Sequence, residues 1–466
     1  MEMNLASWAL RPRLISWRTV NSSDVKYFCD SPKAFKYRFF PSDAQAAQLA
    51  RTFGCARFVY NQDLEFRSQA WQQEKKSIGY HDTDLKLTEW KSMRRRDFVR
   101  SLIPSLALSQ VAFARNQVSS ATPLAQAFEA TRQKYNLPSL AGAIVTSKGA
   151  GEIIVTGVRK AGTDVAVTAN DKWHLGSDTK VMTTCLLATL IEGKKLKWET
   201  TMAEIFPEQA KSMSPELQKL SLLHLLSHHA GLPSNLMWRS FAKPGKSLKE
   251  QRAAVVEQVA TIKLNSEPGT KYEYSNLGYV VAGAIAEKVS GKPWEELMQK
   301  IIFDPLGMKS AGFGGLGTPG RIDQPWPHGA DGKPTEKNGP DLDNAAVLGP
   351  AGTVHCALSD WAKFIADQLC GARGKNGLLK SESYKQIQTT HFEGNYALGW
   401  LVADRKWGNG KVLTHAGSNT MNYALAWVAP LRDAAFLVCT NMGGDNAAKA
   451  TDEITGLMIK EHFPNG

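Results

Sequence analysis

The sequence predicts a mixed α/β (α+β) fold, in which an antiparallel β-sheet is flanked by helices and carries a large inserted helical subdomain. Short strands occur near residues 141–158 and again near residues 411–440, and about 240 mostly helical residues lie between the two sets. Strands at both ends of a helical segment indicate one sheet covered by helices. A basic strand–helix–helix pattern within residues 33–71 predicts a small helix-turn-helix-like fragment ahead of this body.

The first strand set follows an amphipathic helix that we predict over residues 124–135. Strands are predicted at 141–147 and 152–158, and the glycine-rich stretch 148–151 between them is a hairpin signal.

Three more strands are predicted near the end of the chain, at 411–415, 423–428 and 434–440, and a closing helix at 446–462. A cleft between the sheet and the helical subdomain is the expected position of a site.

Charge is concentrated at one end of the chain. The 466 residues carry a net charge of +12, and residues 1–114 hold 18 Lys or Arg against 11 Asp or Glu. Such asymmetry indicates a distinct segment. Six Cys without a C-x-x-C pair exclude a disulfide-dense scaffold and a zinc ribbon. No apolar run reaches eighteen residues, so we predict no integral membrane segment.

Basic and aromatic residues alternate at the start of the fragment with the period of a strand: Lys33, Phe35, Lys36, Tyr37, Arg38 and Phe39. The full pattern K-x-x-K-Y-R-x-x-P…Q…L…x-F-G-x-x-R-F-V-Y-N resembles the amino-terminal segment of OrfB-type transposases over about residues 33–90. The paired C-x-x-C of that family is missing. We therefore interpret residues 1–92 as a remnant, and nucleic acid is not the expected partner.

Residues 93–114 have the order of an export signal. Met93 precedes three arginines, a mildly apolar stretch follows, and Ala112-Phe113-Ala114 has the small-x-small form of a cleavage site. The R-R-x-F-V-R core resembles a twin-arginine signal. An ordinary basic amphipathic helix is the alternative. Translation from Met93 would place residues 115–466 in the periplasm or outside the cell, whereas an unread internal signal would leave the protein in the cytoplasm.

The most informative motif is Ser177-Asp178-Thr179-Lys180, followed by apolar residues at helical spacing. Residues three apart share a helix face, so the Lys180 ammonium can reach the Ser177 hydroxyl. A helix N-terminus also favours an anion at this position. The motif taken by itself is weak, because an N-cap serine followed by a surface lysine gives the same letters.

Two further motifs strengthen this interpretation. Tyr274-Ser275-Asn276 precedes another predicted helix, and Thr414-His415-Ala416-Gly417-Ser418 ends an edge-type strand in small residues. Together the three motifs resemble those of the serine β-lactamase and penicillin-binding protein superfamily, most closely its class C-like branch, over about residues 120–460.

The resemblance implies a role for each matching residue. Ser177 matches the acylated nucleophile, Lys180 its activating partner and Tyr274 the tyrosine that shuttles a proton. The implied substrate-binding residues are Asn276, His415, Gly417 and Ser418, and the N–H groups of Ser177 and Ser418 match an oxyanion pair. His-Ala-Gly replaces the Lys-Thr-Gly of many relatives, which removes a cation from the strand and favours esters or amides that lack a carboxylate.

Activation of Ser177 needs a base at neutral pH. We expect desolvation to lower the pKa of Lys180, and the neighbouring ammonium to lower the pKa of Tyr274. The two groups would titrate as a pair, so the identity of the base stays open. No metal or cofactor is predicted: His224 and His228 have the spacing of two ligands on a helix, but their leucine-rich flanks indicate a core helix.

The expected function is that of a serine hydrolase that forms an acyl-enzyme on Ser177 and hydrolyses a β-lactam, a D-amino peptide or a small ester. The alternative is a non-catalytic penicillin-binding-protein-like binder or sensor. A nucleic-acid binder acting through residues 33–90 ranks third. The expected partner is a small-molecule or peptidoglycan-like substrate, and the sequence leaves the oligomeric state open.

Overall fold

The computed structural model describes residues 2–4, 36–38 and 122–464. The chain divides into two units, Met1–Ser119 and Ser120–Gly466. In the first unit, strands β1 (Glu2–Asn4) and β2 (Lys36–Arg38) pair in antiparallel fashion, with Met3 opposite Tyr37. Strand β2 falls inside the stretch for which the sequence predicts a strand. The predicted helices of this unit and the predicted signal at 93–114 lie outside the described residues.

The second unit is built on a six-stranded antiparallel sheet with the order β4-β3-β11-β10-β9-β8. Its strands are β3 (Ser139–Thr146), β4 (Gly149–Gly157), β8 (Leu401–Arg405), β9 (Gly410–Ser418), β10 (Tyr423–Ala429) and β11 (Ala434–Thr440). The N-terminal hairpin and the C-terminal strands therefore join into a single sheet, which confirms the predicted fold class.

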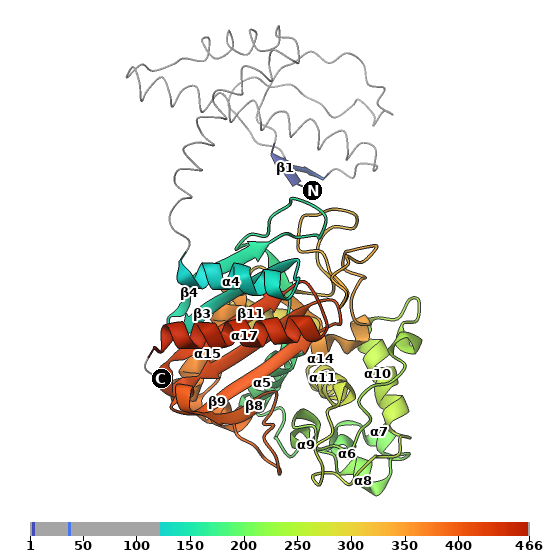
Figure 1. Cartoon of the computed structure of the whole chain (residues 1–466). Coiled ribbons are helices and arrows are strands. Elements are labelled where there is room, and N and C mark those ends of the chain that lie inside the picture. Colours follow the sequence, from blue (N-terminus) through green and yellow to red (C-terminus); the bar gives the residue numbers. More distant parts are fainter. Residues whose placement is uncertain (1, 5–35, 39–121, 465–466) are drawn as a thin grey trace, which may run out of the picture. The chain divides into compact units, whose positions relative to one another are not determined.

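Helices cover both faces of this sheet. Helices α4 (Pro123–Lys134) and α17 (Asp445–His462) lie across one face in Figure 1. Phe436 and Val438 of β11 pack in the same apolar cluster as Phe128 of α4 and Ile454 of α17. The alternate residues of β11, such as Leu437, belong to the large cluster on the other face. Both faces of β11 are thus buried, as its unbroken apolar sequence requires.

The opposite face packs against α5 (Thr179–Glu192) and α15 (Leu358–Ala372). The remaining helices of the sheet side are α12 (Trp294–Met298), α13 (Asp304–Leu306), α14 (Gly349–Gly352) and α16 (Ser381–Ile387). A helical subdomain contains α6 (Met202–Ile205), α7 (Pro207–Ala210), α8 (Pro215–Gln218), α9 (Leu222–Leu226) and α10 (Leu248–Val259), which gather away from the sheet in Figure 1. Helix α11 (Asn276–Ser290) connects this subdomain to α5 and α14.

A buried ion-pair cluster fixes helix α10 against its neighbours. The Arg252 guanidinium donates to Glu287 of α11 and to Glu295 of α12, with shortest distances of 2.7 Å to each carboxylate. The Arg252 side chain is fully buried. Loss of the Arg252 charge would leave Glu287 as an unpaired ion in the core.

A second, three-stranded sheet is absent from the sequence prediction. It has the order β5-β7-β6, formed by β5 (Lys172–His174), β7 (Val354–Ala357) and β6 (Gly312–Phe313). Strands of two to four residues give too short a pattern to be recognised from alternation. This small sheet positions the nucleophile turn, because β5 ends two residues before Gly176.

The predicted elements of the body agree with the structure to within a few residues, but strand β8 (Leu401–Arg405) was not predicted, and two of the predicted features differ. The hairpin turn is shorter than predicted, since β4 begins at Gly149. Strand β9 is not the edge strand, because β8 pairs with it from Gly410 to Thr414. In the described part of the chain, no strand pairs with residues 415–418 on that side, so only this end of β9 is an open edge. Among the described residues no helix is long and apolar enough to cross a membrane.

Candidate active site

Ser177 lies on a single 3₁₀ turn, Gly176–Asp178, between β5 and α5. The sequence predicts it at the start of the helix, and the helix itself begins two residues later at Thr179. Ser177 is partly exposed, whereas its neighbours Gly176 and Asp178 are buried. The hydroxyl is therefore accessible on an otherwise buried turn.

Two glycines allow this turn to lie against strand β9. Gly176 has a φ of +50°, and a Cβ atom there would collide with the main chain of Gly417 and Ser418. In the reverse direction, a Cβ on Gly417 would collide with the Leu175 carbonyl and lie 2.6 Å from the Ser177 nitrogen. Only glycine meets the conformational requirement at 176 and the close approach at 417. The backbone nitrogens of Ser177 and Ser418 are thus brought to one place.

Lys180 is fully buried and its Nζ has three oxygen neighbours. Nζ lies 3.0 Å from Ser177 Oγ, 2.8 Å from Asn276 Oδ1 and 2.7 Å from the Ala351 carbonyl oxygen. Burial lowers the pKa of Lys180 to about 7, and the nearby Asp178 opposes that shift. A desolvated ammonium without a full counter-charge gives up its proton more easily. About half of Lys180 is therefore neutral at pH 7.

The three contacts suit both protonation states of Lys180: the ammonium donates to all three oxygens, whereas the neutral amine donates to two of them and accepts from the Ser177 hydroxyl. The Asn276 amide oxygen and the Ala351 carbonyl accept hydrogen bonds and cannot donate them. A neutral Nζ has two N–H groups for these two oxygens and one lone pair for the Ser177 hydroxyl proton. The geometry therefore supports transfer of the Ser177 proton to Lys180.

Tyr274 comes from the loop before α11, as predicted. Its ring centre lies 4.9 Å from Lys180 Nζ. Burial raises the pKa of Tyr274 far above its usual value, and Ser177 offsets the rise only in part. Our expectation that the neighbouring ammonium lowers this pKa is wrong, because desolvation of a phenolate outweighs a neighbour that is itself half neutral at pH 7. Tyr274 therefore stays protonated at neutral pH.

Asn276 is the first residue of α11, which Ser275 caps through its Oγ to the Gly278 N–H at 3.1 Å. The Asn276 Nδ2 donates to Asn235 Oδ1 at 3.0 Å. Trp238 Nε1 also donates to Asn235 Oδ1 at 3.0 Å. An indole N–H only donates, so the Asn235 atom that faces Trp238 Nε1 is the amide oxygen. The same oxygen faces Asn276, so the Asn276 atom that contacts it is the amide nitrogen. Asn235 keeps the Asn276 oxygen turned toward Lys180.

Sequence reasoning missed Asn235. It lies 41 residues from Asn276 in the chain. A single asparagine in a loop carries no local signal that it will meet another segment.

His415 is buried on β9 and is uncharged. Its Nε2 lies 3.0 Å from the Tyr396 hydroxyl, and its Nδ1 lies 3.8 Å from Asp178 Oδ1. Burial, reinforced by Lys180, lowers the pKa of His415 to about 3. The strand therefore carries no positive charge at this position at neutral pH, in line with the loss of a cation that the sequence indicates.

Asp178 follows the nucleophile directly in the chain. It is fully buried, and neither carboxyl oxygen has a hydrogen-bond partner within the described ranges. Burial raises the pKa of Asp178 well above its usual value. Burial thus works against the charge of this carboxyl group, as it works against the charge of Lys180.

The two histidines spaced like metal ligands have other partners. His224 Nδ1 lies 2.9 Å from Ser221 Oγ and closes the start of α9. His228 Nδ1 accepts from the Ser275 N–H at 3.0 Å, and its ring lies 4.3 Å from that of Tyr274. His228 thus supports the tyrosine loop. In the described part of the chain no group of three His, Cys, Asp or Glu is arranged to hold a metal ion.

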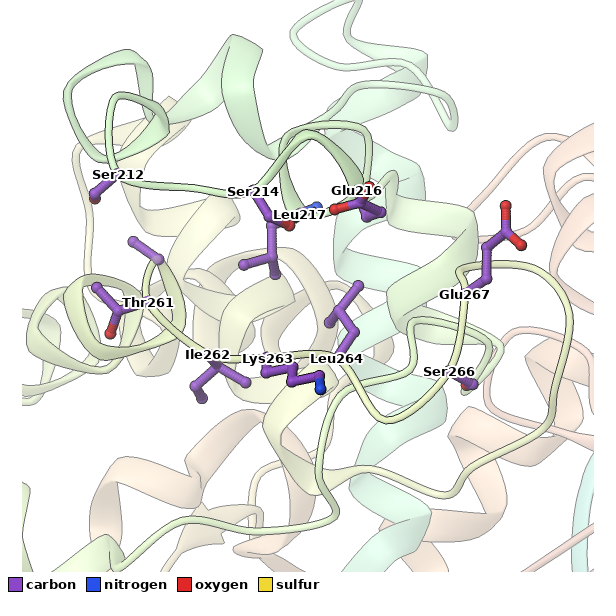
Figure 2. A pocket seen from close by; sticks show the side chains of 11 residues that line it. Ser212, Ser214, Glu216, Leu217, Thr261, Ile262, Lys263, Leu264, Ser266 and Glu267 are labelled. Carbon is purple, nitrogen blue, oxygen red and sulfur yellow. Dashed lines mark hydrogen bonds between the residues drawn. The ribbon is translucent and has the colours of Figure 1, made fainter.

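A cavity of about 640 Å³ lies within the helical subdomain, between segment 212–217 and segment 260–267 (Figure 2). Its lining includes the charged residues Glu216, Lys263 and Glu267, together with serine and threonine hydroxyl groups and the apolar side chains of Leu217 and Leu264. None of the seven predicted site residues borders this cavity. The site around Ser177 is instead assembled by the turn before α5, the loop before α11 and the open end of β9.

Comparison with known proteins supports both parts of the sequence interpretation. A family model described as a helix-turn-helix domain, of the OrfB type, matches residues 32–76. A protein of Streptomyces pristinaespiralis, provisionally named an RNA-guided DNA endonuclease, is 49% identical over 78 residues, which cover 17% of this chain and 19% of that protein. The resemblance of the amino-terminal segment to OrfB-type proteins is thereby confirmed.

The body matches a different group of proteins. Penicillin-binding protein 4 of Amycolatopsis lactamdurans is 28% identical over 39% of this chain and 46% of its own length. The N-acetylmuramyl-L-alanine amidase of Bacillus subtilis is 31% identical over 29% of this chain and 32% of its own length. The chain thus matches less than half the length of these curated relatives.

A solved structure shares the fold. The octameric penicillin-binding protein homologue from Pyrococcus abyssi superposes with a TM-score of 0.58 at 19% identity, over 74% of this chain and 79% of its own. The family model described as beta-lactamase matches residues 124–457, well over half of the chain. Over these residues the chain belongs to the beta-lactamase family, within the superfamily of serine hydrolases.

Proposed function

We propose that the protein is a serine hydrolase that forms an acyl-enzyme on Ser177. The observation that carries this proposal is the fully buried Lys180, whose Nζ lies 3.0 Å from Ser177 Oγ and whose pKa falls to about 7. A serine becomes a nucleophile when an adjacent base removes its proton. A surface lysine after an N-cap serine would be solvated and would keep its charge.

Acylation begins when Ser177 Oγ transfers its proton to Lys180 Nζ and attacks the substrate carbonyl carbon. The negative charge that develops on the carbonyl oxygen faces the N–H groups of Ser177 and Ser418. One such donor contributes about 3–4 kcal/mol to a transition state of this kind. Tyr274 then donates its hydroxyl proton to the leaving group, and the Lys180 ammonium returns a proton to Tyr274. The leaving group departs protonated and Lys180 is again neutral.

Deacylation follows the same route with water in place of the leaving group. Water attacks the ester carbon as its proton passes to Lys180, Ser177 Oγ leaves with the Tyr274 hydroxyl proton, and the Lys180 ammonium then returns a proton to Tyr274. Both partners end in their starting states. Because the two groups exchange a proton in each half-reaction, the site behaves as one coupled acid–base unit.

The substrate class follows from the charges around the site. Residues 415–418 form an open strand edge, beside which the acyl part of a substrate can lie. His415 is neutral there, so this edge offers no cation to a substrate carboxylate. We therefore assign esters and amides without a carboxylate next to the scissile carbonyl, including small esters and amidated peptides, ahead of β-lactams and peptides with a free C-terminus. Because relatives are named an N-acetylmuramyl-L-alanine amidase and, provisionally, a D-alanyl-D-alanine carboxypeptidase, we include alanine-containing peptides among the amides to test.

A hydrolysis panel tests this function on the full chain. The panel contains nitrocefin, p-nitrophenyl esters, and D-alanyl-D-alanine peptides with free and with amidated ends. We expect turnover of the esters and of the amidated peptide, and none with Ser177→Ala. A burst of one equivalent without turnover would indicate the non-catalytic binder instead. The exposed Ser240→Ala is the matched control and should behave as wild type.

The processing of the chain is a separate part of the proposal. Residues 93–114 act as a twin-arginine export signal, cleavage after Ala114 releases residues 115–466, and residues 1–92 are a remnant without a role in hydrolysis. Amino-terminal sequencing of the native protein tests this. A mature end at Arg115 in the periplasm or medium supports it, and an intact Met1 in the cytoplasm contradicts it.

A further inference from the structure

A buried histidine–aspartate pair lies directly behind the nucleophile turn. His174 Nε2 is 2.8 Å from Asp343 Oδ2, and both side chains are at least 98% buried. The other ring nitrogen, Nδ1, accepts from the Gly176 N–H at 3.1 Å. Nδ1 therefore carries no proton, and Nε2–H donates to Asp343. His174 ends β5, whereas Asp343 lies on the long loop that precedes α14.

The second oxygen of Asp343 continues the network to the turn after β9. Asn419 Nδ2 donates to Asp343 Oδ1 at 2.8 Å. Asn419 Oδ1 accepts from the Met421 N–H at 3.2 Å and from Asn422 Nδ2 at 3.1 Å. One chain of hydrogen bonds thus runs from Gly176, beside the nucleophile, to Met421, in the β9–β10 turn.

The polarity of this network requires a carboxylate at its centre. Both ends, the N–H groups of Gly176 and Met421, are main-chain donors that point inward. His174 and Asn419 each accept on one side and donate on the other. The residue between them must accept on both sides, which a carboxylate does and an amide of the same shape does not.

The network joins the two segments that carry the backbone nitrogens of Ser177 and Ser418. These nitrogens come from separate elements, which the Gly176–Gly417 contact brings together. We propose that His174, Asp343 and Asn419 are positioning residues that set the separation of the two oxyanion donors. This proposal rests on the acyl-enzyme function proposed above, and none of the three residues contacts the reacting atoms in it.

The test moves the carboxylate from residue 343 to residue 419, the next side chain in the hydrogen-bond network. The variants are made in the full chain. In Asp343→Asn, the new amide N–H₂ faces another donor, either His174 Nε2–H or Asn419 Nδ2. In Asn419→Asp, the new carboxylate faces the carboxylate of Asp343. The double variant Asp343→Asn/Asn419→Asp restores every donor and acceptor, because the carboxylate then accepts from the residue at 343 and from Met421. The exposed Asp331→Asn on the same loop is the control for the chemical change.

The kinetic readout is the hydrolysis of p-nitrophenyl acetate. It is measured as kcat and KM, with kcat calculated from the concentration of folded protein. We expect each single variant to lose roughly 10- to 100-fold in kcat with KM within about threefold, since misplacement of about 1 Å costs rates of this order. The double variant should return to within about threefold of wild type. Single variants that acylate at the wild-type rate, or a folded double variant that fails to recover, would overturn the proposal.

A spectroscopic readout is independent of catalysis. Two-bond ¹⁵N–¹H correlation of His174, assigned with His174→Gln, reports which ring nitrogen carries the proton. We expect protonated Nε2 in the wild type and in the double variant, and a changed ring signal in Asp343→Asn. Protonated Nδ1 in the wild type would refute the network whatever the activity. An inactive wild type with the expected tautomer would refute the proposed function and the positioning role, and would leave only a structural network.

Discussion

The pH dependence of acylation follows from the buried Lys180. Its pKa of about 7 means that the neutral, basic form rises from about one tenth at pH 6 to about nine tenths at pH 8. Since the neutral form accepts the Ser177 proton, the acylation rate should rise about tenfold across this window and then level off. The protonated Tyr274 adds no second step below pH 10, because its pKa is raised.

A negative charge placed beside Nζ should move this profile. Asn276→Asp keeps the shape of the side chain and puts a carboxylate where the amide oxygen now lies, 2.8 Å from Nζ. At an effective dielectric constant of about 20, unit charges at that distance attract by about 6 kcal/mol. Burial of the new carboxylate removes part of this energy. We expect about 3 kcal/mol to remain, which raises the midpoint by about two pH units.

The assay is the rate of fluorophosphonate labelling from pH 5 to pH 10. Wild type should show a midpoint near pH 7, and Asn276→Asp a midpoint near pH 9, with a rate about 50-fold lower at pH 7. The exposed Asn409→Asp is the control and should keep the wild-type midpoint. A wild-type rate that is flat between pH 6 and pH 8, or an Asn276→Asp midpoint that does not move, would refute Lys180 as the base.

Three other changes test separate parts of the site and fold. Asn235→Ala releases the Asn276 amide, so kcat should fall about tenfold with little change in KM, as a substrate titration would show. His415→Gln should leave the pH profile unchanged from pH 5 to pH 9, since His415 with a pKa of about 3 is already neutral there; a shifted midpoint would mean that it titrates. Arg252→Met leaves Glu287 unpaired in the core and should lower the free energy of unfolding by about 3–5 kcal/mol, measured by urea denaturation.

Local spacing, together with the resemblance to the serine β-lactamase and penicillin-binding protein superfamily, identified much of the site. Ser177 and Lys180 are three residues apart, and the Tyr274–Asn276 motif comes just before its helix, so helical geometry decides which side chains meet. Five of the six strands of the large sheet were also predicted, from apolar runs or turn signals, whereas β8 was missed because its short sequence LVADR ends in charged residues.

The contacts that were missed join distant segments. His174 and Asp343 are 169 residues apart, and a lone aspartate on a long loop gives no sign of its partner. The small sheet was missed because its strands are too short to show alternation. The direction of the Tyr274 pKa shift was wrong because the depth of its burial, which outweighs the charge of Lys180, is a property of the packed structure.

The most direct test of the account is mass-spectrometric mapping of the acylated protein. The full chain is quenched within seconds of mixing with a fluorophosphonate or a p-nitrophenyl ester, digested, and searched for the modified peptide. The account predicts one adduct, on Ser177, in the wild type and none in Ser177→Ala. An unmodified wild-type protein, or an adduct on another residue that persists in Ser177→Ala, would contradict it.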